Sequence, residues 1–97
     1  MHARVSFYNL GNALRDDVAR AFEDARGPVE QMQGNQGGLV LVSPDTGRAI
    51  TITFWESEDA LRASEQLANQ ARQQAAGRAG MEIANIEAYE VALKFGG

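Results

Sequence analysis

The chain has 97 residues, a formal charge of −4 at pH 7 and no cysteine. This length is typical of one domain, which we expect to span residues 1–97. The negative charge argues against nucleic-acid binding, which needs clustered Lys and Arg side chains to neutralise phosphates. The lack of cysteine excludes disulfides, zinc–thiolate sites and cysteine nucleophiles, and no apolar run is long enough to span a bilayer. We therefore expect a cytoplasmic protein with neither nucleic-acid nor membrane partners.

The first part of the chain predicts a strand and then a helix. Residues 4–8 alternate between polar and apolar side chains, as in a half-buried strand. Asn12 is a candidate cap for the helix that follows, whose apolar side chains recur at helical spacing. The pair Gly27-Pro28 predicts the end of this helix. The polar, glycine-rich segment 29–38 then predicts a short helical turn and a loop.

The middle of the chain predicts a β-hairpin followed by a second helix. Residues 39–42 form one apolar strand, and residues 44–47 (Pro-Asp-Thr-Gly) are a strong turn signal. The alternating Ile and Thr residues of 49–55 form the next strand. Ser57 is a candidate N-cap, with acidic residues just after it where the helix dipole favours them. The second helix is expected over residues 58–76.

The last part of the chain predicts a long fourth strand over residues 81–95, with a bulge near residues 85–87 where the alternation breaks. The element order is then βαββαβ, which predicts a ferredoxin-like α+β sandwich with an antiparallel sheet. The two helices would cover one face of this sheet. The other face is too apolar to remain in water, so we expect a second copy of the chain to cover it.

The second predicted helix has an unusually shallow apolar stripe. Small side chains on this stripe would let the helix pack closely on the sheet, or would leave a gap beneath it in which a ligand could bind. The stripe consists of Leu61, Ser64, Leu67, Ala68, Ala71 and Ala75.

Two segments of the chain resemble a known family. Gly37-Gly38-Leu39 leads into the second strand, and Phe54-Trp55-Glu56-Ser57-Glu58-Asp59-Ala60-Leu61 leaves the third. In both segments the chain is similar to the antibiotic biosynthesis monooxygenase-like (ABM) branch of the dimeric α–β barrel superfamily. The resemblance implies a homodimer with a small-molecule cavity in each protomer. It also implies a cofactor-independent monooxygenase acting on an aromatic or polyketide-type molecule. The alternative is a non-catalytic dimeric module of the same fold that binds a small apolar or aromatic ligand.

The same family includes haem-degrading proteins, and the chain shares little with their haem site. Asn9 could stand where their strand-one asparagine stands. The tryptophan of their second helix would fall near Ser64, however, and their haem-ligating histidine near Gln74. The single histidine, His2, lies at a predicted strand end. We therefore expect no haem and no other cofactor.

Five residues are candidates for the ligand pocket, and no residue is assigned a catalytic role. Asn9 could polarise a substrate carbonyl, or it could satisfy the backbone of the turn that follows. Trp55 could line the cavity, or fix the corner between strand and helix. Tyr8 and Tyr89 could hydrogen-bond a phenol, or simply pack. The predicted pocket set is Asn9, Trp55, Ser64, Ala68 and Tyr89.

The charged residues give two further expectations, one about ion pairs and one about metal binding. The helix arginines should pair with nearby acids such as Glu58. No cluster has the spacing of metal ligands, so we expect no metal site. The arginines in question are Arg62, Arg72 and Arg78.

Overall fold

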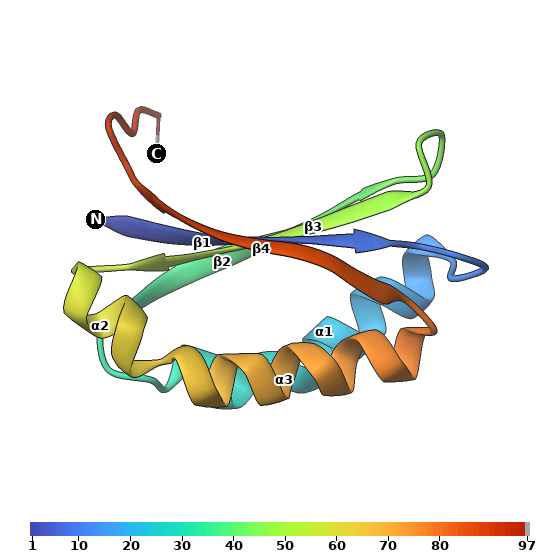
Figure 1. The fold of residues 1–97 in the computed structure, drawn as a ribbon, viewed down its shortest axis with the longest axis horizontal. Coiled ribbons are helices and arrows are strands. Elements are labelled where there is room, and N and C mark those ends of the chain that lie inside the picture. Colours follow the sequence, from blue (N-terminus) through green and yellow to red (C-terminus); the bar gives the residue numbers. More distant parts are fainter. Residues whose placement is uncertain (97) are drawn as a thin grey trace.

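A computed structural model describes residues 1–96 of the chain; Gly97, the last residue of the predicted domain, lies outside this range. One four-stranded antiparallel sheet has the strand order β2-β3-β1-β4, and the helices all lie on one of its faces (Figure 1). The predicted ferredoxin-like βαββαβ fold is therefore confirmed. The elements are β1 (His2–Asn9), α1 (Arg15–Glu30), β2 (Asn35–Ser43), β3 (Arg48–Trp55), α2 (Glu58–Ala63), α3 (Glu65–Ala79) and β4 (Glu82–Glu90).

The alternation of side chains along β1 decides which residues face the helices. The guanidinium group of Arg4 donates a hydrogen bond to the carbonyl of Leu61, and the ring of Tyr8 contacts that of Phe22 on α1. The even-numbered side chains of β1 thus point toward the helices, and the odd-numbered ones point away. The register of the sheet carries this division to its neighbours. The face without helices, here called the open face, carries Val5, Phe7, Leu39, Leu41, Ile50, Ile52, Phe54 and Tyr89.

The hydrophobic core lies under one end of the sheet. It includes Tyr8 from β1 and Val18 from α1, both almost completely buried. Alanines of α3 pack against them, which lets this helix approach the sheet and α1 closely. Two other alanines of α3, Ala68 and Ala71, line the opposite, less filled end of the layer. The core cluster consists of Tyr8, Leu10, Val18, Ala21, Ala49, Ala75, Ala76, Ala79 and Met81.

The first helix differs from the prediction at both ends. It begins at Arg15, and the backbone N–H of Leu14 is 3.4 Å from the Asp17 carboxylate, so Asn12 is not its cap. It also continues through Pro28 to Glu30, where the prediction ended it at Gly27-Pro28. Pro28 has no N–H to bond the carbonyl of Asp24 four residues earlier, but it lies in the last turn, so only one intrahelical hydrogen bond near the end of the helix is lost.

The second predicted helix is two helices, α2 and α3, which meet at Ser64. The hydroxyl of Ser64 donates to the carbonyl of Leu61 over 2.6 Å and accepts from Arg4 over 3.1 Å. These bonds tie the junction to the central strand. The start of α2 agrees with the prediction, since the Ser57 side chain accepts a hydrogen bond from the backbone N–H of Ala60.

The edge strands also differ from their predicted bounds. β2 begins at Asn35, four residues before the predicted strand. Between Asn35 and Gly38 its pairing with β3 shifts by one residue. Gly37 takes up this irregularity with a φ of +96°, a conformation that glycine adopts easily. β4 ends at Glu90, short of the predicted Phe95, and its extra residue is Ala84, next to the predicted bulge.

Within residues 1–96, no helix combines the length and the apolar composition needed to cross a membrane.

Candidate functional site

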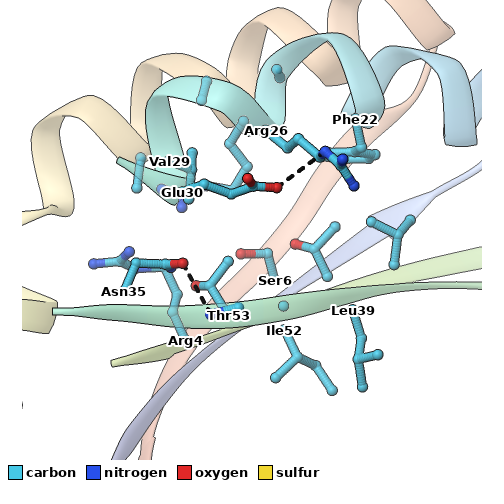
Figure 2. Close-up of a pocket in the computed structure, with 18 of the residues that line it drawn as sticks. Arg4, Ser6, Phe22, Arg26, Val29, Glu30, Asn35, Leu39, Ile52 and Thr53 are labelled. Atoms are coloured by element: carbon cyan, nitrogen blue, oxygen red, sulfur yellow. Dashed lines mark hydrogen bonds and ion pairs between the residues drawn. The ribbon is translucent and has the colours of Figure 1, made fainter. Parts of the chain in front are cut away.

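A cavity of about 450 Å³ lies between the sheet and the helices α1 and α3. Figure 2 shows that Ser6 and Thr53 point from the sheet into this space, while Phe22 and Val29 of α1 point into it from the opposite side. The side chains of Leu39 and Ile52 point to the open face, so the backbone of these two residues forms the wall. The cavity therefore occupies the part of the layer that the core leaves unfilled.

The sheet side of the cavity is polar and the helix side is mostly apolar. The polar groups follow from the alternation of β1 and β3, which turns one side chain in two toward the helices. Four residues of the helix wall are alanines, whose short side chains occupy little of the space. The sheet contributes Arg4, Ser6, Tyr8, Thr51 and Thr53, and the helices contribute Ala19, Phe22, Ala25, Val29, Ala68 and Ala71.

The rim of the cavity lies between α1 and β2, where charged side chains are exposed. Arg26 bridges two acids of its own helix, with nitrogen–oxygen distances of 3.4 Å to Glu23 and 3.1 Å to Glu30. Figure 2 shows the Arg26–Glu30 pair on the cavity side of α1. On the opposite side of the rim, the exposed glycines Gly37 and Gly38 present only backbone.

Tyr8 is the most deeply buried polar group that faces the cavity, with 1% of its surface exposed. Its hydroxyl lies 3.0 Å from that of Thr51. Burial raises the pKa of the Tyr8 phenol above its ordinary value, although the hydrogen bond to Thr51 and the charge of Arg72 oppose the rise. Tyr8 is therefore a protonated phenol near neutral pH and can donate a hydrogen bond.

Two buried arginines, Arg4 and Arg72, also line the cavity. Arg4 donates to Ser64 and to the carbonyl of Leu61, and its guanidinium carbon lies 5.7 Å from the centre of the Trp55 ring. Burial lowers the pKa of both guanidinium groups, and repulsion from Arg72 lowers that of Arg4 further. Both remain charged, because arginine starts from a very high pKa. The cavity thus has a positive region beside its apolar wall.

The structure places Ala68 of the predicted pocket set in the cavity wall and the other four residues elsewhere. Asn9 is exposed at the end of β1, and Tyr89 lies on the open face, 47% exposed. Trp55 is fully buried, and its indole N–H donates to the Thr53 hydroxyl over 3.0 Å. Ser64 touches the site indirectly, as the hydrogen-bond acceptor that holds Arg4.

Sequence analysis missed Ser6, Thr51 and Arg72 as cavity residues. The alternation of β1 and β3 did contain a signal for the first two, because Tyr8, Ser6 and Thr51 share one face of the sheet. Arg72 lies one turn after Ala68 on α3, which also places it on the cavity side. Within residues 1–96 Arg72 forms no ion pair with an acid, contrary to expectation, whereas Arg62 pairs with Glu58 and Arg78 pairs with Asp24.

The cavity does not suit haem. A haem iron ligand from the protein would be an imidazole, a thiolate, a thioether or an available phenolate. Neither His2 nor a methionine lines the cavity, and the chain has no cysteine. The Tyr8 phenol is held neutral and engaged with Thr51, and Gln74 is exposed on α3. In the part of the chain that the structure describes, no cluster of three or more His, Asp or Glu residues could hold a metal ion.

Fold and cavity together define a ferredoxin-like protein with a site of small-molecule size. The family description "antibiotic biosynthesis monooxygenase" matches residues 1–76, which is most of the chain. The chain belongs to this family. A comparison with curated proteins gave no match.

Several solved structures share the fold over nearly the whole chain. The haem degrader MhuD from Mycobacterium tuberculosis, with two haems bound, has a TM-score of 0.73 at 21% identity and covers 99% of this chain and 100% of its own. SnoaB, a cofactor-independent oxygenase from Streptomyces nogalater, has a TM-score of 0.68 at 12% identity; the match covers 96% of this chain and 94% of SnoaB. A protein from Deinococcus radiodurans assigned to the same family has a TM-score of 0.70 at 18% identity, covering 99% and 97%. At these identities the likeness concerns the fold.

Proposed function

We propose that the protein is a cytoplasmic homodimer and a cofactor-independent monooxygenase, which oxidises an aromatic or polyketide-type molecule in the cavity between sheet and helices. The observation that carries this proposal is the cavity itself. Its volume of about 450 Å³ falls in the range of small-molecule sites. Apolar walls with a few converging polar groups are also typical of such sites.

The chemistry that we propose needs no resident cofactor, because the substrate supplies the electrons. A phenolate or enolate gives electrons to O₂, and a carbon–oxygen bond forms to yield a hydroperoxide. Loss of water from this hydroperoxide leaves a carbonyl group, so one oxygen atom enters the product and the other leaves as water. The protein must bind the anion, exclude water and stabilise the negative charge.

The residues of the cavity support each of these tasks. Tyr8 can donate a hydrogen bond to an oxygen of the substrate, and Arg72 supplies positive charge beside it. Phe22 and the alanines of α1 and α3 offer an apolar surface to an aromatic ring. Among the solved structures of this fold, SnoaB is a cofactor-independent oxygenase and MhuD a haem degrader. We place this chain with the former chemistry, because its cavity lacks a suitable iron ligand.

The test is oxygen consumption by the purified, metal-free protein with a panel of anthrones and polyhydroxylated naphthalenes. We expect oxygen uptake that needs only protein and substrate, with a product that has gained one oxygen atom and lost two hydrogens. Tyr8→Phe should slow this reaction. A panel without turnover, or turnover that depends on added metal or flavin, would contradict the proposal.

A second candidate, a non-catalytic module that binds a small ligand, is favoured by one observation. The buried wall of the cavity has no histidine, aspartate or glutamate that could accept a proton, since Glu23 and Glu30 stand exposed at its rim. Binding without turnover in the same panel, seen as a higher melting temperature, would support this function.

The homodimer is proposed from the open face. Five of its side chains are half-buried, and three are exposed: Leu39 by 52%, Leu41 by 45% and Tyr89 by 47%. Figure 1 shows that the helices leave this whole face of the sheet uncovered. A contiguous apolar surface of this kind is typical of an interface. A second copy would bury it by packing sheet against sheet.

A further inference from the structure

The buried arginines Arg4 and Arg72 are the unusual feature of the cavity. One comes from the central strand and the other from α3, and they are 5% and 7% exposed. Both also line a second, more polar cleft beside β4, so the pair separates this cleft from the cavity. The two side chains are close enough for the charge of Arg72 to disfavour the charged form of Arg4.

Neither buried arginine has an acidic partner among residues 1–96. Their hydrogen bonds go to neutral oxygens, which are the Ser64 hydroxyl and Leu61 carbonyl for Arg4 and the Asn69 side-chain oxygen for Arg72. The Nε of Arg72 is buried and has no hydrogen-bond partner among residues 1–96. By contrast, several exposed arginines each contact a carboxylate: Arg15, Arg26, Arg62 and Arg78.

In this protein the exposed arginines are paired and the two buried ones are not, which is the reverse of what solvation favours. Exposed arginines need no partner, since water solvates them, whereas buried charges are normally paired. Two adjacent buried cations without a counter-ion also repel each other. Glu65 is the acid whose charge acts on both arginines, but it is exposed and forms no ion pair with either. The region therefore holds two buried positive charges with no carboxylate in contact with either among residues 1–96.

We propose that Arg4 and Arg72 form an anion subsite, and that the ligand of the cavity is an aromatic carboxylate. Its ring lies against Phe22 and the alanine wall, and its carboxylate lies against the guanidinium group of Arg72, which lines the cavity. A planar carboxylate matches the fork of donors on a guanidinium group. This inference rests on the proposed binding of an aromatic molecule in the cavity and specifies the chemical class of that molecule.

The test compares two ligands of equal shape that differ in charge, 2-naphthoate and 2-naphthamide, by calorimetric titration of the wild-type protein. We expect the dissociation constant of the naphthoate to be about 10- to 100-fold lower than that of the naphthamide. This ratio corresponds to the free energy that a hydrogen bond to a charged group contributes. Formate, an anion without a ring, should bind more weakly than the naphthoate. Equal binding of naphthoate and naphthamide would overturn the proposal, and so would formate binding as tightly as naphthoate.

Variants of α3 sharpen the comparison. Arg72→Gln should bring the ratio between the two ligands close to one, and Arg72→Lys should retain part of it. Arg78→Gln is the matched control, since Arg78 lies on the same helix, is exposed and pairs with Asp24 outside the cavity; it should leave the ratio unchanged. A full preference for naphthoate in Arg72→Gln would contradict the subsite. If Arg72→Gln does not fold, the wild-type comparison still decides.

The outcome is separable from that of the oxygenase assay. Preference for naphthoate without oxygen uptake by any substrate would support the anion subsite and contradict the monooxygenase. Turnover of neutral phenols without preference for naphthoate would support the monooxygenase and contradict the anion subsite.

Discussion

At the scale of single residues, Ala68 is the position at which the open space of the cavity can be tested. It is 7% exposed and lies in the helix wall of the cavity. Ala68→Phe should place a ring in the ligand space, so ligand binding should be lost. Because the ring enters an existing space, the loss of stability should stay below the about 1–3 kcal/mol typical of an overpacked core.

Thermal melts with and without 2-naphthoate would measure both effects of this substitution. Leu67→Phe serves as the control, because Leu67 is the preceding residue of α3 but is 56% exposed. It should keep both ligand binding and melting temperature. A large fall in melting temperature for Ala68→Phe would mean that the space is filled in solution.

Tyr8 gives a prediction for pH. The chain has two tyrosines, so Tyr89→Phe leaves Tyr8 as the single phenol to be followed by ultraviolet absorbance. Burial raises its pKa, and its phenolate should therefore form above pH 10, the value for a free tyrosine being about 10. Fluorescence of Trp55 would show that the protein is still folded. Ionisation at the ordinary pH in the folded protein would contradict a buried Tyr8.

The same shift makes stability depend on pH in a defined direction. Above the unfolded pKa of about 10, the unfolded chain releases the Tyr8 proton while the folded protein keeps it. The free energy of unfolding should therefore fall as the pH rises from 10 toward the folded pKa, and should be insensitive to Tyr8 below that window. Tyr8→Phe should remove this part of the slope.

Residue-scale prediction from sequence succeeded where local chemistry decides and failed where distant segments meet. Ser57 caps its helix as predicted, because cap and helix are adjacent in the chain. The interaction of Arg4 with Ser64 and Leu61 joins residues about sixty positions apart, so no local pattern could indicate it. The missing partner of Arg72 is likewise visible only once the sheet and both helices are in place.

At the scale of elements, the start of β2 depends on close packing of its backbone. A Cβ atom added to Gly38 would lie 2.7 Å from the carbonyl oxygen of Ile52 on β3. Gly38→Ala should therefore push the two strands apart and destabilise the protein by about 1–3 kcal/mol.

Gly77 of α3 is the contrasting glycine, since an added Cβ there meets nothing within 4 Å. Gly77→Ala should raise stability by up to about 1 kcal/mol, because alanine is the better helix former. Chemical denaturation of both variants measures the two effects. Changes of the same sign would contradict this account of the β2–β3 contact.

The bounds of the elements show the same division between local and distant causes. The order of strands and helices followed from alternation and helical spacing, both of which are written into the sequence. The residues at which the helices end could not be predicted from these patterns, because α1 continues through Pro28 and the second predicted helix divides at Ser64. The division at Ser64 comes with its contact to Arg4, which is distant in sequence, whereas the propensities of Gly27 and Pro28 favour an earlier end for α1.

At the scale of the whole molecule, the open face predicts the state of assembly. Leu41→Arg would place a charge on this face, at a side chain that is 45% exposed. We expect light scattering to give a dimer for the wild type, with an interface above the roughly 1,000 Å² of a biological contact, and a monomer for the variant.

Leu67→Arg is the matched control for this experiment. Leu67 is similarly exposed but lies on α3, on the far side of the helix layer from the open face. It should leave the dimer intact. A wild-type monomer at micromolar concentration, or equal effects of both variants, would contradict assembly through the open face.

The position of β1 in the sheet also has a consequence for how the chain acquires its structure during synthesis. β1 is made first, yet its two neighbours, β3 and β4, are made later. Its second edge stays unpaired until residues 82–90 of β4 have emerged. Nearly the whole chain must therefore be released before the sheet can close, and pairings this distant in sequence are slow to form. During that interval a nascent β1 has an exposed edge that a chaperone, or another unfinished chain, could engage.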